Sequence, residues 1–398
     1  MIQHENREEE DSVFADSTNL TERFRLFLKE NIRFFYPVLI VFSTKLLCSI
    51  FFYHYFDLSS TDTAWMIRGY DRSLIGNPLV RWPFLYQGWD SGWHLIIIFK
   101  GYFYQAYAFF PGYPISIYLF NLVINDFFAS AAVSSLIFGV AWMPFFQATA
   151  ERHMSREASS RVTLLVAFFP YVFLFTTVAY SESLFLFASV ASWYFHQNNR
   201  LLRANLLAAV ATVTRMLGIF IVLPIFLDLL HRRKYRNFFY ISIPVAALFA
   251  WFSYCYVNTG EWFASTTVQS KYWNMYSFLR WAIDSVSQGT ISDFDGILGS
   301  PVSPMIMMIV TLFFIYFGRK VDWRLTLYSI SYFLIILCFA SLESVARYLS
   351  FIFPMWMALG RLTLQGKWGN ILTAALCVLF VSIACSLWHR FLLTIWVA

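Results

Sequence analysis

The chain has 398 residues, of which 59% are hydrophobic, 21% aromatic and only 13% charged, and its formal net charge is +6. A soluble globular domain carries about 25% charged residues, so this composition indicates a membrane protein. The Lys and Arg residues lie in short loops between apolar segments, where they orient a membrane protein, and this placement argues against nucleic-acid binding.

Residues 1–33 begin with an acidic tract at 8–11 and end in basic residues directly before the first apolar run. This pattern predicts a cytosolic tail with a juxtamembrane basic helix, because a cleavable signal peptide would begin with a short positive region. Residues 34–398 show no repeat and no linker rich in Pro, Gly or Ser. We therefore expect them to form a single membrane domain.

Apolar segments recur along this domain. A helix that spans the bilayer needs about 20 apolar residues, because the hydrocarbon core is about 30 Å thick and a helix rises about 1.5 Å per residue. The pattern predicts an all-α polytopic fold with about 10–11 transmembrane helices, although several segments are short. The segments run over 34–56, 107–125, 128–150, 162–180, 182–196, 204–230, 238–257, 304–317, 325–342, 349–360 and 371–390.

The charged loops predict the orientation of these segments. Basic clusters at 232–236, 319–324 and 361–367 indicate three cytosolic loops, whereas the loops 57–106 and 258–303 are expected to face outward. One stretch conflicts with a count of crossings from a cytosolic N-terminus, because the count places 151–161 outside although it contains three Arg. Segments 162–180 and 182–196 therefore either cross the membrane or form a re-entrant hairpin.

The outer loop 57–106 is rich in aromatic residues and contains the run from Trp89 to His94, which includes Asp90. An acid beside bulky aromatic side chains at the membrane interface is partly desolvated, which raises its pKa and suits it to take a proton from a hydroxyl. Alternatively, Asp90 caps a helix that begins near Gly92. The sequence leaves both interpretations open.

Two prolines follow closely, where Phe110, Pro111, Tyr113 and Pro114 open the segment 107–125. Proline fixes the backbone dihedral φ, so this motif predicts a rigid helix start. Beside the aromatic residues, such a start would also hold a lipid or a sugar ring.

Charged residues also interrupt the apolar segments. Ser181 and Glu182 break the run 162–196, and Arg215 lies near the middle of 204–230. An Arg at the centre of a membrane helix costs about 2.5–3.5 kcal/mol. It therefore needs either a partner such as Glu182 or a phosphate, which the planar guanidinium binds through two N–H groups.

Arg347 and Tyr348 lie between two late apolar segments, on the predicted outer side. Arg347 either pairs with Glu343 one helical turn earlier or supplies a second cation for a lipid phosphate. The five cysteines have no CxxC spacing and indicate small core residues. No Gly-rich phosphate loop, HExxH motif or Ser-His-Asp arrangement is present, so no metal and no cofactor are predicted. An enzyme that acts outside the cytosol would then need a lipid-carried donor.

Several of these motifs follow one another in the same order as the motifs of a known enzyme family. Taken along the chain they resemble the PIG-V family, the second mannosyltransferase of glycosylphosphatidylinositol (GPI) assembly and its prokaryotic relatives, within the GT-C glycosyltransferase superfamily. The resemblance covers about half the chain, from Trp89 to about Leu230 and again near Arg347. It is carried by Trp89-Asp90, Gly101-Tyr102, Ala108 to Pro114, Tyr180 to Phe185, Thr214-Arg215 with Gly218, and Arg347-Tyr348.

The resemblance implies a GT-C-like fold and transfer of mannose from a polyprenyl- or dolichyl-phosphate carrier to a lipid-linked acceptor, either a GPI-type intermediate or a prokaryotic glycoconjugate. Asp90 would be the general base, and Arg215 and Arg347 would hold the donor phosphate. It also implies the endoplasmic reticulum membrane in a eukaryote or the plasma membrane in a prokaryote, and a small accessory membrane subunit. Substrate contacts are expected from Trp89, His94, Phe110, Pro111, Tyr113, Ser181, Glu182 and Tyr348.

Two other classes of function compete with an enzyme. In a transporter or lipid flippase, Arg215 and Glu182 would line a substrate path, but the inverted repeat common in such folds is not apparent. A membrane scaffold without catalysis is the third interpretation, and the concentration of polar residues in one outer loop argues against it.

Overall fold

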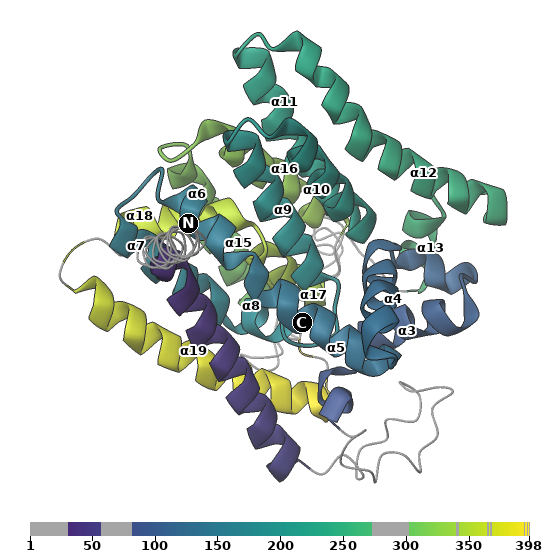
Figure 1. Cartoon of the computed structure of the whole chain (residues 1–398), viewed down its shortest axis with the longest axis horizontal. Helices are drawn as coiled ribbons and strands as arrows, with labels where there is room; N and C mark the ends of the chain where they lie inside the picture. The colour runs from purple at the N-terminus through teal and green to yellow at the C-terminus, as the bar shows by residue number, and fades with distance from the viewer. Residues whose placement is uncertain are drawn as a thin grey trace, which may run out of the picture.

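A computed structural model of the chain describes residues 31–56, 82–272, 302–339, 342–363, 366, 368–393, 395 and 397. Every regular element in these ranges is a helix, which confirms the all-α fold class (Figure 1). The acidic tract at 8–11, most of the predicted cytosolic tail and large parts of the two predicted outer loops lie outside the described residues.

Within each described range the helices follow one another with short connections. A helix over Asn31–Tyr55 comes first. The others are η4 (Trp82–Tyr86), α3 (Asp90–Lys100), η5 (Tyr104–Ala108), α4 (Gly112–Ile124), α5 (Phe127–Ala141), α6 (Met143–Ala150), α7 (Arg156–Phe168), α8 (Pro170–Phe175), α9 (Glu182–Gln197), α10 (Leu201–Thr214), η6 (Met216–Ile221), α11 (Val222–His231), η7 (Tyr235–Ile241), α12 (Ser242–Thr259), α13 (Ala264–Tyr272), α15 (Val302–Gly318), α16 (Trp323–Phe339), α17 (Leu342–Ser350), α18 (Phe353–Thr363) and α19 (Gly369–Leu392).

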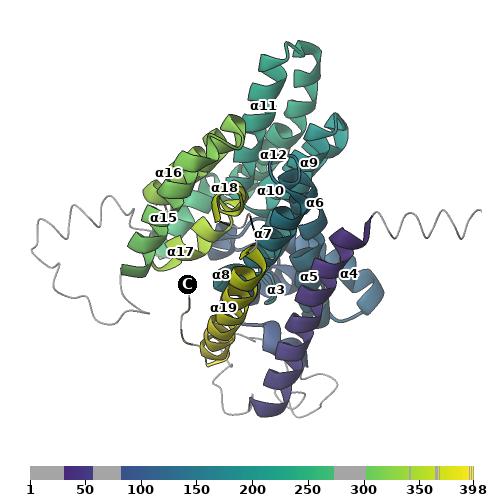
Figure 2. The same cartoon turned by 90° about the vertical axis from the view of Figure 1, so that its left-hand side faces the viewer.

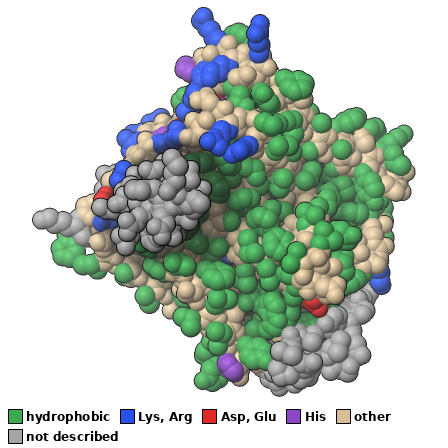
Figure 3. Space-filling model, in the orientation of Figure 1, with side chains coloured by type: hydrophobic (Ala, Val, Ile, Leu, Met, Phe, Trp, Pro, Cys, Tyr) green, Lys and Arg blue, Asp and Glu red, His purple; other side chains and the backbone are tan. Residues whose placement is uncertain are grey.

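Within these ranges, four helical stretches are long and apolar enough to cross a membrane: Asn31–Tyr55, Phe127–Ala150, Tyr235–Thr259 and Gly369–Leu392. Five shorter apolar helices of 10–17 residues accompany them. The surface over these helices is largely hydrophobic (Figure 3), and apolar residues such as Leu47, Val123 and Phe239 are exposed. A soluble protein rarely exposes apolar patches of this extent, so the chain is an integral membrane protein.

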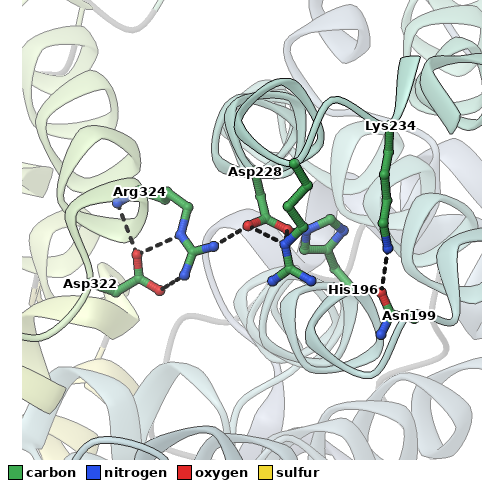
Figure 4. Close-up of polar contacts among 7 residues, drawn as sticks. His196, Asn199, Asp228, Lys234, Asp322 and Arg324 are labelled. Carbon is green, nitrogen blue, oxygen red and sulfur yellow. Dashed lines mark hydrogen bonds and ion pairs between the residues drawn. The ribbon is translucent and has the colours of Figure 1, made fainter. Parts of the chain in front are cut away.

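The helices α9, α10 and α11 run in alternating directions, because Glu182 meets Arg215 at one end and His196 meets Asp228 at the other. The bundle therefore has two distinct ends (Figure 2). The turn between α8 and α9 lies beside the end of α10, because Ser181 accepts a hydrogen bond from Arg215. At the opposite end, the last turns of α9 and α11 meet the start of α16 through His196, Asp228 and Arg324 (Figure 4). We call the first the cavity end and the second the basic end, because Lys and Arg gather around it (Figure 3).

The stretch 151–161, whose charges conflicted with the crossing count, lies at the basic end. Glu151 pairs with Arg33 at 3.2 Å, and Arg161 donates a hydrogen bond to Asn370 at 2.8 Å. The count failed because α4 has only 13 residues, about 20 Å of helix, which is too short to cross a bilayer. The helices α7 and α8 then lead from the basic end to the cavity end, and α9 returns.

Candidate active site

Four charged side chains from four separate elements form one continuous network. Arg347 Nη1 lies 3.3 Å from Asp90 Oδ2, and Arg347 Nε lies 3.3 Å from Glu182 Oε1. The same Glu182 oxygen lies 2.7 Å from Arg215 Nη1. The structure thus brings together the acid of the first predicted outer loop, the two intramembrane charges and the late arginine. We call these four residues the cavity network.

Asp90 is the first residue of α3, but its side chain does not cap the helix. The preceding Trp89 occupies the N-cap position, where no side-chain hydrogen bond caps the helix. The capping interpretation of Asp90 is therefore wrong, and its carboxylate points to Arg347 instead. Trp89 has a φ of 51°, a conformation that is strained for a bulky residue and that clusters at functional sites. The Asp90 amide donates to the Tyr180 hydroxyl at 3.2 Å, which fixes this sharp turn.

The Asp90 carboxylate is held only loosely. Its side chain keeps 19% of its surface exposed, and Oδ1 has no hydrogen-bond partner among the described residues. Burial raises the pKa of Asp90 above its ordinary value, and the Arg347 charge offsets this rise only in part. A carboxylate with a raised pKa and a free oxygen is suited to accept a proton.

Glu182 lies behind the two arginines as the first residue of α9, with 2% of its side chain exposed. The turn that leads into it is fixed from the first helix, where the fully buried Lys45 donates to the carbonyl oxygen of Thr176 at 2.8 Å. Nζ of Lys45 satisfies carbonyl oxygens that the end of α8 leaves without an intrahelical partner. Lys45 therefore positions the segment that carries Ser181 and Glu182.

Arg215 does not lie in the middle of a helix, which corrects the sequence-based expectation. α10 ends at Thr214, the Arg215 backbone is extended with φ −150° and ψ 140°, and η6 begins at Met216. The chain folds back so tightly that a Cβ on Gly218 would lie 2.2 Å from the Ala211 carbonyl group. This break in the helix turns the Arg215 side chain toward Glu182.

Arg347 lies on α17 and is almost fully buried. Its guanidinium carbon lies 5.0 Å from the centre of the Phe175 ring and 4.8 Å from that of Tyr348, and Arg215 lies 4.9 Å from the same Tyr348 ring. Nη2 of Arg347 also donates to the Tyr348 hydroxyl at 3.0 Å. These ring contacts hold the two guanidinium groups side by side despite their like charges.

A cavity of about 140 Å³ opens beside this network. Three members of the network face it directly: Asp90, Arg215 and Arg347. One helical turn after Asp90, His94 lies in the same wall, and its buried Nδ1 has no hydrogen-bond partner among the described residues. Burial, together with the Arg215 charge, lowers the pKa of His94 to about 3. His94 is therefore a neutral group that can hydrogen-bond an uncharged ligand.

The predicted substrate contacts divide into two groups. His94, Phe110, Ser181 and Tyr348 line the cavity, whereas Trp89, Pro111, Tyr113 and Glu182 do not. The completely buried Tyr113 donates to the Ala131 carbonyl oxygen at 2.9 Å, so it joins α4 to α5. Pro111 precedes α4 as the predicted rigid start.

The sequence analysis missed the wall contributed by α13. Ser265, Thr266 and Gln269 line the cavity from this helix, which Gln269 fastens to η5 through a 2.9 Å hydrogen bond to the Ala108 carbonyl oxygen. The only signal was the polar composition of the predicted outer loop 258–303, and this did not single out any residue. Apolar residues complete the wall: Ala108, Phe109, Met216, Leu217, Ile335 and Ile336, together with Thr214.

No family model matches the sequence, and a search of curated proteins finds no match either. Among solved structures, the fold is similar to the crystal structure of ArnT from Cupriavidus metallidurans bound to undecaprenyl phosphate. The TM-score is 0.49 and the identity 13%, over 83% of this chain and 69% of that chain. A likeness of this size carries no argument about the site.

Proposed function

We propose that the chain is a lipid-dependent glycosyltransferase of the GT-C type, which transfers a sugar from a polyprenyl- or dolichyl-phosphate carrier to a lipid-linked acceptor. The observation that carries this proposal is the cavity itself, because one loosely held carboxylate, the buried Arg347 and the partly buried Arg215 face the same space. The function needs a base and a phosphate-binding group within reach of one sugar ring, and these residues supply both.

The two arginines would hold the donor phosphate. Guanidinium groups bind phosphate oxygens through pairs of N–H groups, and Arg215 and Arg347 are kept adjacent by a shared Glu182 oxygen. In a buried site their charges act more strongly than in water. They would therefore stabilise the negative charge that develops on the phosphate as it leaves.

Asp90 would be the general base. The oxygen of an acceptor hydroxyl forms a bond to the anomeric carbon, while the bond from that carbon to the phosphate oxygen breaks and its electron pair stays on the phosphate. The hydroxyl proton passes to Asp90. Attack from the face opposite the leaving phosphate inverts the anomeric centre, and the step needs no nucleotide.

The finer assignments rest on the resemblance to the PIG-V family alone. These are mannose as the sugar, a GPI-type intermediate or a prokaryotic glycoconjugate as the acceptor, and a small accessory membrane subunit as a partner. We propose that the basic end faces the cytosol, as the positive-inside rule predicts, and that the cavity opens toward the other face. The membrane would be the endoplasmic reticulum in a eukaryote and the plasma membrane in a prokaryote.

The test is transfer of radiolabelled mannose from synthetic polyprenyl-phosphate-mannose by the purified protein in lipid, with several candidate acceptors. Asp90→Asn is measured beside Glu261→Gln, which removes the same charge from an exposed position that does not line the cavity. Loss of transfer in Asp90→Asn alone supports the proposal. Full activity of that variant overturns the base assignment, and no transfer by folded wild-type protein with any acceptor overturns the mannosyl donor.

A further inference from the structure

We propose that the donor phosphate and the Asp90 carboxylate compete for Arg347, so that binding of the lipid donor frees the base that the reaction needs. This inference rests on the proposed function. It concerns the order of events in the site, in which Asp90 is paired with a cation before the donor arrives and released afterwards.

The charges of the site support this competition. The cavity network contains two carboxylates and two guanidinium groups, which balance one another in the absence of a ligand. A lipid phosphodiester adds one negative charge. Because a buried charge without a counter-ion is unfavourable, the phosphate must take over a cation that a carboxylate now holds.

The geometry indicates which carboxylate gives way. Glu182 is buried behind the arginines and does not line the cavity, whereas Asp90 does. Both acids lie 3.3 Å from Arg347, but Glu182 is held in addition by Arg215 at 2.7 Å. A ligand that enters through the cavity therefore meets Asp90 first.

The aromatic surroundings of Arg347 restrict where the phosphate can bind. The guanidinium carbon lies near the rings of Phe175, Tyr180 and Tyr348, so oxygen ligands must approach the edge of the group. Nε lies 3.3 Å from the buried Glu182, whereas Nη1 lies 3.3 Å from Asp90 and Nη2 donates to the Tyr348 hydroxyl. The edge that faces the cavity is thus the one that Asp90 occupies.

Release from Arg347 would raise the proton affinity of the Asp90 carboxylate, as the reaction requires. Besides Arg347, the groups that face Asp90 are Tyr180, Glu182 and Arg215. With the Arg347 charge shared by a phosphate, the carboxylate binds a proton more tightly and is a better base. After transfer, Asp90 has gained a proton and the phosphate one negative charge, so the total charge of the site is unchanged.

The test measures binding of a synthetic polyprenyl monophosphate to the full chain in lipid nanodiscs, without any acceptor. Asp90→Asn removes the competitor, so we expect it to bind the lipid about tenfold more tightly than wild type, a typical coupling between two linked sites, although it is inactive in transfer. Arg347→Gln should bind more weakly than wild type. In the double variant the gain from Asp90→Asn should disappear, and the charge-matched Glu261→Gln should bind like wild type.

The outcomes separate this inference from the proposed function. If both Arg347→Gln and Arg215→Gln weaken binding while Asp90→Asn binds no more tightly than wild type, the competition is wrong and the phosphate site stands. A gain in Asp90→Asn that persists in the double variant also overturns the competition. If neither arginine variant changes binding in folded protein, the proposed function itself fails.

Discussion

In the described residues, two networks of acids and arginines lie at opposite ends of the bundle, and they differ in how completely the acids are paired. In the basic-end network, Asp228 contacts His196 at 2.7 Å, Arg232 at 3.0 Å, and Arg324 (Figure 4). Both oxygens of Asp322 accept from Arg324, at 2.8 and 2.9 Å. In the cavity network, Asp90 uses one oxygen for one long contact, and its other oxygen has no hydrogen-bond partner in the described part of the chain.

The comparison shows that residue type and burial do not by themselves indicate a catalytic role. The basic-end network satisfies its carboxylate oxygens with protein groups and joins α9, α11 and α16, so it stabilises the fold. The cavity network keeps a carboxylate partly exposed beside an open space, so it retains interactions for a ligand. The predictions below test this contrast, beginning with the largest expected effect.

Asp90→Asn should lower the rate of transfer by about 10²–10⁴-fold, the usual contribution of a general base. It should lower stability less than Asp228→Asn, because Asp90 makes one 3.3 Å contact whereas Asp228 pairs with three groups. The amide keeps the shape of the side chain but cannot take up the proton. Turnover of polyprenyl-phosphate-mannose and the thermal midpoint of the same preparation provide the two readouts. A large fall in the thermal midpoint would instead give Asp90 a structural role like that of the basic-end network.

Asp228→Asn should produce the opposite pattern and lower the free energy of unfolding by about 1.5–3 kcal/mol, because the buried Asp228 loses its charge-assisted hydrogen bonds to Arg232 and Arg324. Protein that remains folded should transfer sugar at a rate close to wild type, since the cavity network is untouched. Thermal unfolding in lipid, together with activity per folded molecule, checks this. Strong loss of specific activity in well-folded protein would contradict a structural role.

Arg347→Lys should lower transfer by about 10²-fold, the effect of losing an oriented donor at a developing negative charge. The charge is retained, but lysine lacks the planar group that stacks between rings and binds two oxygens. Arg232→Lys at the basic end is the matched control, because Arg232 is more exposed, and it should leave activity unchanged. If both substitutions lowered transfer equally, the cavity network would not differ from the basic-end network in its role in the reaction.

The pH dependence of transfer should show an acidic limb governed by Asp90. The base acts when deprotonated, so activity is lost as pH falls through its pKa. Because burial raises that pKa above 3.8, the loss should begin at a higher pH than for an exposed Asp, with a tenfold fall in rate per pH unit below it. His94, whose pKa is lowered to about 3, should contribute no limb near neutrality. Rate profiles of wild type and His94→Gln that coincide in shape would agree with this.

His94→Gln should have the smallest effect, a rise of about 3- to 10-fold in KM for one substrate, as expected for one hydrogen bond to an uncharged group. The side chain lines the cavity one turn from Asp90 but does not belong to the cavity network. Separate titrations of donor and acceptor would show which substrate His94 contacts. A fall in kcat as large as that of Asp90→Asn would instead make His94 part of the proton transfer.

Some features of this protein follow from the sequence alone. The long apolar segments determine that the chain is helical and lies in a membrane, because an isolated backbone in hydrocarbon must satisfy its own hydrogen bonds. Asp90, Glu182, Arg215 and Arg347 also stand out in the sequence, because a charge is costly wherever the surrounding residues are apolar. Both conclusions depend on local properties, which a sequence displays directly.

Only the tertiary structure decided how these residues meet. The short α4 reverses the predicted direction of the helices from α5 to α10, and the break after Thr214, which turns Arg215 toward Glu182, restores it from α11 on. The helix α13 brings Gln269 to the cavity from a loop of ordinary polar composition. The tertiary structure also brings the buried Lys45 to the carbonyl oxygens of Phe173 and Thr176, at the end of α8. Ion pairs and cavity walls join residues far apart in the chain, and no local pattern of hydropathy or charge specifies which of them come into contact.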